Sequence, residues 1–202
     1  AASEMVHHLY QQGARSFLIL GSTHTRATSS AGALRQRGIE KALTELGLDS
    51  WAWRSVEVSP WTAEGAESAL SQWLESNTLP DAIFTMNDLL GAGALRALSR
   101  AQVRVPQDVL VSSWDDTVLS RFSTPALTTI SPDTHAIAHE AVAGLIALIE
   151  GNGRTGEPGE AKGPDTDTTE TLNPAHSNQP STQVSDVTVS YTLTVRESTK
   201  RV

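Results

Sequence analysis

The chain has 202 residues, 39% of them hydrophobic, and a formal net charge of -8 at pH 7, which predicts a globular protein of one domain or slightly more. The absence of cysteine excludes disulfides, zinc-thiolate sites and thiol catalysis. No apolar run reaches the roughly 18 residues that span a bilayer, and no basic patch suits a phosphate backbone, so we expect neither membrane contact nor nucleic-acid binding by this chain itself.

Apolar strands and amphipathic helices alternate along the first part of the chain. Helical spacing over residues 3–12 leads into an apolar run at 16–21, as in a buried parallel strand. The next helix spans 33–46, and its pattern places Leu34 and Ile39 on the inward side. The alternation predicts a doubly wound α/β fold, in which a parallel sheet carries helices on both faces. The remaining predicted strands are 51–58, 81–86 and 109–114, and the remaining predicted helices are 62–75 and 89–100.

The pattern changes after residue 130. Residues 134–150 are strongly apolar and predict a helix. Residues 151–181 are rich in Gly, Pro, Thr, Asp and Glu and almost lack large apolar residues, which predicts a disordered or long-loop insertion. Residues 186–196 alternate apolar and polar positions, and this period predicts a half-solvated edge strand.

Polar residues follow three of the predicted strands. Arg35 stands in the first turn of the helix after the first strand, Asn87 directly follows the third strand, and Asp115 directly follows the fourth. Ligands of open parallel sheets bind beyond the carboxyl ends of the strands, so we expect these residues to share one edge. Together with Trp61 or Trp114 they suit a neutral polyhydroxylated ligand, because hydroxyls need donors and acceptors and a sugar ring stacks on an aromatic face.

Each of these polar residues also has a purely structural interpretation. Arg35 is a helix charge that solvent can surround, and either Asn87 or Asp88 suits the N-cap of the following helix. The adjacent carboxylates of Asp115 and Asp116 are equally typical of a turn. The other tryptophans are expected to pack on the core rather than bind a ligand; they are Trp51, Trp53 and Trp73.

Enzymatic interpretations have less support in the sequence. Asp115 and Asp116 could act as acid and base, but adjacent side chains usually point in different directions. His135 and His139 are four residues apart on an apolar helix and could bind a metal, yet no partner glutamate motif accompanies them, which favours packing. Neither a G-x-S-x-G motif nor a glycine-rich phosphate loop occurs. We therefore expect a protein that is not an enzyme and has no metal or cofactor.

Five segments, in this order, resemble motifs of the LacI/GalR family of bacterial transcription regulators. Each motif is modest alone, but their shared order is highly specific. The resemblance covers residues 1–150 and about 184–200. The segments are RQRGIEKAL at 35–43, LPDAIFTMNDLLGAG at 79–93, VPQDV followed by WDD at 105–116, PALTTI at 125–130 and VREST at 195–199.

The resemblance implies a type I periplasmic-binding-protein fold of two α/β subdomains, with a sugar, nucleobase or related effector in the cleft. It implies that Arg35, Asn87 and Asp115 contact the effector, and that Trp61 stands near the position of a stacking aromatic residue. The family usually has glycine and then an aromatic residue before its first carboxylate. This chain has Trp114 at the aromatic position and Ser113 in place of the glycine.

The resemblance also divides the chain. It implies that residues 1–130 and 182–202 form the C-terminal effector-binding subdomain, with 151–181 as an insertion. The helix at 131–150 is implied to belong to the N-terminal subdomain, which is otherwise largely missing. The helix-turn-helix module that reads operator DNA is missing as well, so the chain is expected to be N-terminally truncated and to bind effector weakly by itself.

These implications lead to one principal hypothesis and one alternative. We expect a cytoplasmic regulator, because the first residues show no signal-peptide pattern, and a homodimer that contacts operator DNA only through the missing module. The alternative is a solute-binding protein of a sugar uptake system, which shares the fold. The segments at 125–130 and 195–199 favour the regulator.

Overall fold

The computed structural model describes residues 1–22, 31–48, 50–149 and 187–201. The chain divides into two compact units. The first unit comprises Ala1–Asp133 with Ser190–Val202, and the second comprises Thr134–Val189.

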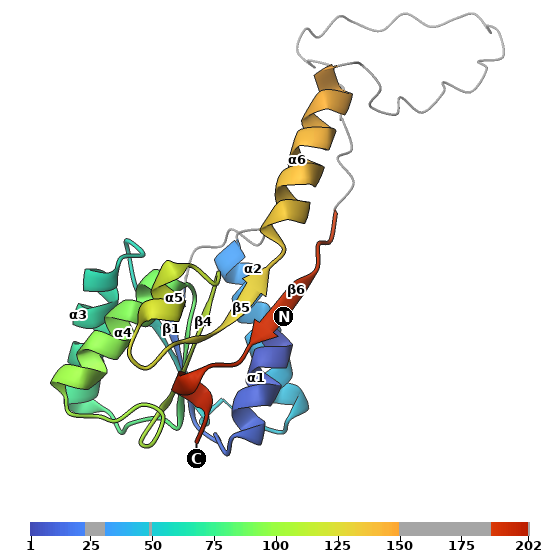
Figure 1. Cartoon of the computed structure of the whole chain (residues 1–202). Helices are drawn as coiled ribbons and strands as arrows, with labels where there is room; N and C mark the ends of the chain where they lie inside the picture. Colours follow the sequence, from blue (N-terminus) through green and yellow to red (C-terminus); the bar gives the residue numbers. More distant parts are fainter. Residues whose placement is uncertain (23–30, 49, 150–186, 202) are drawn as a thin grey trace, which may run out of the picture. The chain divides into compact units, whose positions relative to one another are not determined.

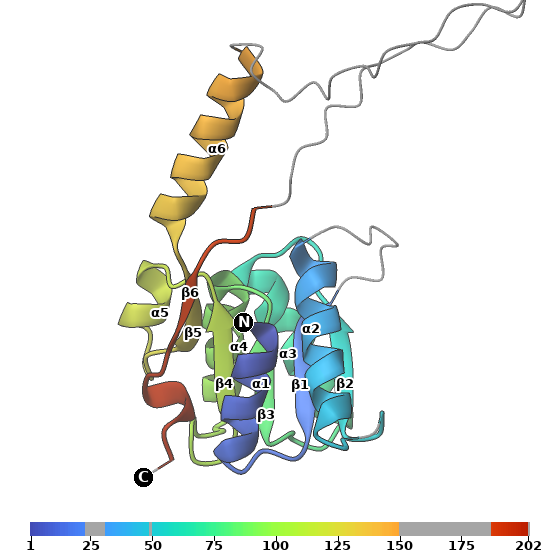
Figure 2. The same cartoon turned by 90° about the vertical axis from the view of Figure 1, so that its right-hand side faces the viewer.

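Six strands form the sheet of the first unit (Figure 1), in the order β2-β1-β3-β4-β5-β6 that the labels of Figure 2 show. Neighbouring strands from β2 to β5 are parallel, and β6 pairs with β5 in the antiparallel direction. The predicted parallel α/β sheet and its predicted edge strand are therefore confirmed, although the edge strand has only four residues. The strands are β1 (Phe17–Ser22), β2 (Trp53–Glu57), β3 (Ala82–Thr85), β4 (Leu110–Trp114), β5 (Thr128–Pro132) and β6 (Tyr191–Thr194).

Helices cover both faces of this sheet. Helices α1 and α2 contact each other on one face, and α3 and α4 contact each other on the opposite face (Figures 1 and 2). A short helix, α5, follows β4 and contacts α4. The helices are α1 (Ala2–Gln11), α2 (Ala31–Glu45), α3 (Ala63–Ser76), α4 (Asp88–Arg100) and α5 (Val118–Phe122), and a 3-10 turn, η1, spans Glu197–Thr199.

The apolar core lies between the sheet and the two helix layers. Every residue of β1 and β3 is buried, as expected of central parallel strands that are covered on both faces. Helices α3 and α4 pack closely at Gly93, where an added Cβ would lie 2.1 Å from the carbonyl oxygen of Ala63. This crossing therefore requires glycine.

Two predicted core positions are wrong. Leu34 is 56% exposed, whereas Ile39 is buried. Five residues correspond to about 140° of rotation around an α-helix, so Leu34 points away from the stripe that contains Ile39. Trp51 is 71% exposed because it lies in the turn before β2 and not in the strand. Trp53 and Trp73 are partly buried against the core, as predicted.

The segment after β6 docks against β4 and β5. Ser198 Oγ donates to the carbonyl oxygen of Val111 at 2.6 Å and accepts from the backbone N–H of Thr128 at 2.8 Å. Thr199 Oγ1 lies 2.7 Å from Thr128 Oγ1 and 2.8 Å from Nε2 of His8 in α1. Residues from α1 and from the segment after β6 are therefore joined in one hydrogen-bond network.

In the second unit the structure describes helix α6 (Thr134–Ile149) and residues 187–189. No residue of α6 is buried, and its largest apolar side chains, including Leu145 and Ile149, are exposed. The predicted insertion at 151–181 lies outside the described residues. Among the helices that the structure describes, none is both long enough and apolar enough to cross a membrane.

Candidate functional site

The carboxyl ends of the parallel strands form the edge at which we predicted ligand binding. From β1 the chain passes outward to β2 and then returns to β3 on the other side of β1. This reversal makes the carboxyl ends of β1 and β3 the topological switch point, where open α/β sheets bind ligands.

Arg35 lies at this switch point and links three segments. One guanidinium nitrogen donates to the carbonyl oxygen of Met86, directly after β3, and the other donates to Asp115 Oδ1 at 3.3 Å. The guanidinium carbon lies 4.4 Å from the centre of the Trp114 ring, within cation-π range. The arginine side chain is only 16% exposed, so its interpretation as a solvated helix charge is wrong. The structure therefore brings Arg35, Trp114 and Asp115 together, and we call these three residues the edge cluster.

Burial shifts the pKa values of both charged residues of the edge cluster. Burial raises the pKa of Asp115, and the neighbouring charge of Asp88 acts in the same direction, while the guanidinium of Arg35 partly offsets both. Burial also lowers the pKa of Arg35, against the opposing influence of Asp115 and Asp88. The cluster thus presents fixed donors, a partly desolvated carboxylate and an aromatic face, which suits a neutral ligand that both donates and accepts hydrogen bonds.

Asn87 and Trp61 occupy the same strand edge in other roles. Asn87 is the N-cap of α4, since its Oδ1 accepts from the backbone N–H of Leu90 at 2.9 Å, which confirms the capping interpretation. Trp61 lies between β2 and α3 and is partly buried against the core. The described contacts of the edge cluster include neither of these side chains.

The adjacent carboxylates of Asp115 and Asp116 face different partners. Asp116 pairs with Arg196 at 2.6 Å, with side chains 20% and 17% exposed, respectively, whereas Asp115 pairs with Arg35. Both aspartates have positive φ, 113° for Asp115 and 54° for Asp116, so the turn interpretation also describes them. Their separate ion pairs give no support to a shared acid-base role.

Asp88 was predicted only as a possible cap, and the structure gives it a larger role. It is 1% exposed, and its carboxylate accepts hydrogen bonds from Ser113, Thr117 and Thr129. These partners follow it by 25 to 41 positions, so no local pattern could have identified them.

The two histidines of α6 do not pack as predicted. Both His135 and His139 are exposed, and no residue of this helix is buried. Across the described part of the chain, no three His, Cys, Asp or Glu side chains gather closely enough to hold a metal ion.

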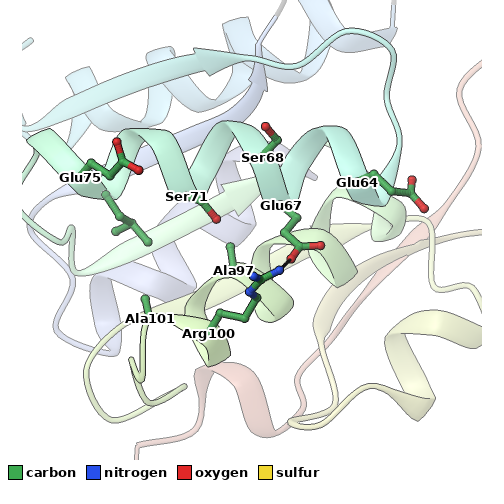
Figure 3. Close-up of a pocket in the computed structure, with 9 residues that line it drawn as sticks. Glu64, Glu67, Ser68, Ser71, Glu75, Ala97, Arg100 and Ala101 are labelled. Atoms are coloured by element: carbon green, nitrogen blue, oxygen red, sulfur yellow. Dashed lines mark hydrogen bonds and ion pairs between the residues drawn. The ribbon is translucent and has the colours of Figure 1, made fainter.

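A groove of about 740 Å³ runs between α3 and α4, away from the predicted site residues (Figure 3). Glu67 points into it from α3 and pairs at 2.9 Å with both Arg96 and Arg100 of α4. The groove therefore contains ion-paired side chains, and its lining includes none of the site residues that the sequence pattern selected.

Comparison with known families identifies the fold that carries the edge cluster. The family model described as "Periplasmic binding protein-like domain" matches residues 6–166. The chain belongs to this family. The matched range extends past residue 150 into the segment 151–181, which the motif resemblance does not cover. The periplasmic binding protein-like domain of this chain has the α/β architecture of LacI-family regulators.

The relatives of this periplasmic binding protein-like domain are LacI-type regulators. The chain is 30% identical over 149 residues to the HTH-type transcriptional repressor PurR of Pasteurella multocida, with 70% of this chain and 41% of the repressor covered. A LacI family transcriptional regulator from Arthrobacter sp. FB24, in complex with lactose, has a TM-score of 0.72 and 27% identity, with 98% and 62% coverage. The Lac repressor dimer bound to operator and the anti-inducer ONPF has a TM-score of 0.65 and 29% identity, with 74% and 44% coverage.

This chain therefore spans less than half the length of the PurR relative. The relatives are transcriptional repressors and not enzymes, which agrees with the expectation of a non-enzymatic protein.

Proposed function

We propose that this chain is the effector-binding part of a LacI-family transcription regulator and that its effector is a sugar or a related polyhydroxylated molecule. The edge cluster carries this proposal, because Arg35, Trp114 and Asp115 meet at the switch point of the sheet. The Arthrobacter relative in complex with lactose supports the sugar.

The chemistry of the cluster fits a sugar in three ways. The guanidinium of Arg35 donates to hydroxyl oxygens, and the carboxylate of Asp115 accepts from hydroxyl hydrogens. The indole of Trp114 offers an apolar surface to the ring carbons. Asn87 and Trp61, at the same edge, are the remaining residues that we propose to contact the effector.

The proposal includes the division of the chain that the motif resemblance implies. Residues 1–130 and 182–202 constitute the C-terminal subdomain, α6 belongs to the N-terminal subdomain, and operator DNA is bound by a module outside this chain. Such a regulator acts in the cytoplasm. A single subdomain supplies only one wall of a cleft, so the 202-residue chain is expected to bind effector weakly.

Titration of the isotope-labelled chain with a sugar panel tests the effector site. Lactose and ribose are expected to shift the indole N–H signal of Trp114 and the side-chain N–H signals of Arg35, with dissociation constants in the millimolar range. Arg35→Met and Asp115→Asn are each expected to weaken binding at least roughly tenfold, because each leaves a desolvated polar group without its partner.

Arg54→Met is the matched control, since Arg54 is an exposed arginine on β2 whose hydrogen bonds within the described residues go to nearby carbonyl oxygens. It is expected to leave sugar binding unchanged. Shifts confined to residues away from the carboxyl strand edge would contradict the site, and a response to adenine or hypoxanthine alone would replace the sugar by a nucleobase.

We also propose that α5 supplies a homodimer contact. Val118, Leu119 and Phe122 are 62%, 41% and 82% exposed and come from one short helix, and the Lac repressor relative is a dimer. Contiguous exposed apolar side chains commonly mark protein interfaces.

Sedimentation equilibrium tests this contact. Phe122→Asp is expected to raise the dimer dissociation constant at least roughly tenfold, because it buries a charge in an apolar interface. Trp51→Ser removes another strongly exposed aromatic residue, outside α5, and is expected to leave association unchanged. A wild-type chain that stays monomeric at high concentration would contradict the proposal.

A further inference from the structure

We propose that Asp88 is a positioning residue, whose buried carboxylate holds both ends of the segment that presents Trp114 and Asp115 to Arg35. The inference rests on the proposed function only in treating the edge cluster as the effector site. The arrangement itself can be tested without an effector.

The geometry of Asp88 supports this role. Asp88 opens α4 and is 1% exposed. Its Oδ1 accepts from Ser113 Oγ and, at 3.2 Å, from Thr129 Oγ1. Its Oδ2 accepts from the backbone N–H of Thr117 at 2.6 Å and from Thr117 Oγ1 at 2.8 Å. One carboxylate therefore binds β4, β5 and the start of α5 to the N-terminus of α4.

The segment between two of these anchors is one that needs support. Ser113 and Thr117 bracket Trp114, Asp115 and Asp116, and both aspartates have φ values in the left-handed region. Residues other than glycine keep this backbone conformation only where the surrounding structure holds them in it. Because Asp88 fixes the residue before and the residue after the segment, it fixes the direction in which Trp114 and Asp115 project.

One of the residues that hydrogen-bond to Asp88, Ser113, departs from the family motif. Ser113 stands where the motif resemblance expects glycine, and its hydroxyl supplies a hydrogen bond that glycine cannot make. Gly91 of α4 leaves room for it, since a Cβ added at Gly91 would lie 3.3 Å from Ser113 Cβ. The departure from the motif is therefore compensated by a contact with Asp88.

A structural role alone predicts a different outcome from a positioning role. If Asp88 only stabilised the fold, its replacement would lower the free energy of unfolding and leave the edge cluster of the folded protein unchanged. If it positions the cluster, its replacement shifts the Trp114 ring relative to the Arg35 guanidinium within the folded state.

Asp88→Asn and Ser113→Gly, compared by NMR in the full 202-residue chain, test this distinction. Both variants are expected to shift the side-chain N–H signals of Arg35, which sense the Trp114 ring, and to move the indole N–H signal of Trp114. Ser113→Gly keeps the charge of Asp88 and removes one anchor, so it isolates positioning from electrostatics and remains informative if Asp88→Asn does not fold. Where a sugar binds, each variant is expected to weaken binding roughly tenfold, as for a lost hydrogen bond to a charged group.

Asp81→Asn is the matched control. Asp81 accepts three hydrogen bonds, from the backbone N–H groups of Arg15 and Ser16 and from Ser16 Oγ, at the amino end of β1, whereas Asp88 accepts four at its own site. It is expected to lower stability and leave the Arg35 and Trp114 signals in place. Unchanged signals in both test variants would overturn the positioning role, whereas failure of every sugar to bind would overturn the proposed effector and leave this test valid.

Discussion

Replacement of Gly93 by alanine is expected to destabilise the first unit by about 3 kcal/mol, the upper part of the range for overpacked positions. An added Cβ would lie 2.1 Å from the carbonyl oxygen of Ala63 and 2.8 Å from Ala66 Cβ. The first of these atoms belongs to the backbone of α3, so no side-chain rotation relieves the clash. The two helices must move apart, and packing contacts between them are lost.

Urea unfolding monitored by tryptophan fluorescence measures this loss. Gly144→Ala is the control, because Gly144 lies in the exposed helix α6 and an added Cβ there meets nothing within 4 Å. It is expected to leave the unfolding midpoint of the first unit unchanged and to favour the helix by about 0.5–1 kcal/mol. Equal midpoints for Gly93→Ala and the wild type would show that α3 and α4 can separate at no cost.

Replacement of Arg196 by methionine is expected to cost about 3 kcal/mol at neutral pH, as in other buried ion pairs that lose one partner. Arg196 pairs with Asp116 at 2.6 Å and donates to the carbonyl oxygen of Leu127 at 2.9 Å and to Ser120 Oγ at 3.2 Å. Without the guanidinium, Asp116 remains a largely buried carboxylate that has lost its cation.

The cost of Arg196→Met is expected to depend on pH. Burial acts to raise the pKa of Asp116, but the hydrogen bonds and charge of Arg196 and the hydroxyls of Ser131 and Ser120 outweigh it, so that pKa lies below 3.8. A lowered folded-state pKa contributes stability above the ordinary pKa of aspartate, and this contribution is lost as pH falls through the folded-state pKa. The difference between wild type and variant should therefore shrink on acidification.

A double-mutant cycle isolates the ion pair. Asp116→Asn removes the carboxylate that Arg196→Met leaves unpaired, so the double variant is expected to regain part of the stability that Arg196→Met loses. The free energy of unfolding of all four proteins, measured at pH 7 and again near pH 3, gives the coupling. A cost that is the same at both pH values and in both backgrounds would assign the effect of Arg196 to its other hydrogen bonds.

The sequence pattern predicted those strands and helices whose buried residues are apolar and recur with a regular period. Strands β1 and β3 are apolar because helices cover both faces of them, so an apolar run sufficed to predict them. Strand β5 was missed because its buried residues include Thr128 and Thr129, whose hydroxyls are satisfied by Arg196 and Asp88. Such partners are distant in the chain and leave no periodic trace.

The candidate site was predictable to the same degree. The rule that ligands bind at the carboxyl ends of strands selected Arg35, Asn87 and Asp115, with Trp61 or Trp114 beside them. The structure brings Arg35, Trp114 and Asp115 together, whereas Asn87 caps α4. The resemblance chose Asp115 over Asp116, but the physical reason, the pairing of Asp116 with Arg196 eighty residues later, is visible only in the structure. The exposure of Trp51 could not be predicted, because it depends on where the turn before β2 lies, and residue propensities do not locate that turn.

The docking of the C-terminal segment on β4 and β5 has a consequence for protein synthesis. Residues 1–133 are synthesised before β6 and residues 196–199. The hydrogen-bonding edge of β5 therefore stays unpaired until its partner strand has been made. The contact of Thr128 with Ser198 spans seventy positions, and long-range contacts of this kind form late in folding. During that interval an unpaired strand edge is available to other nascent chains, and it closes only when β6 and residues 196–199 have been made.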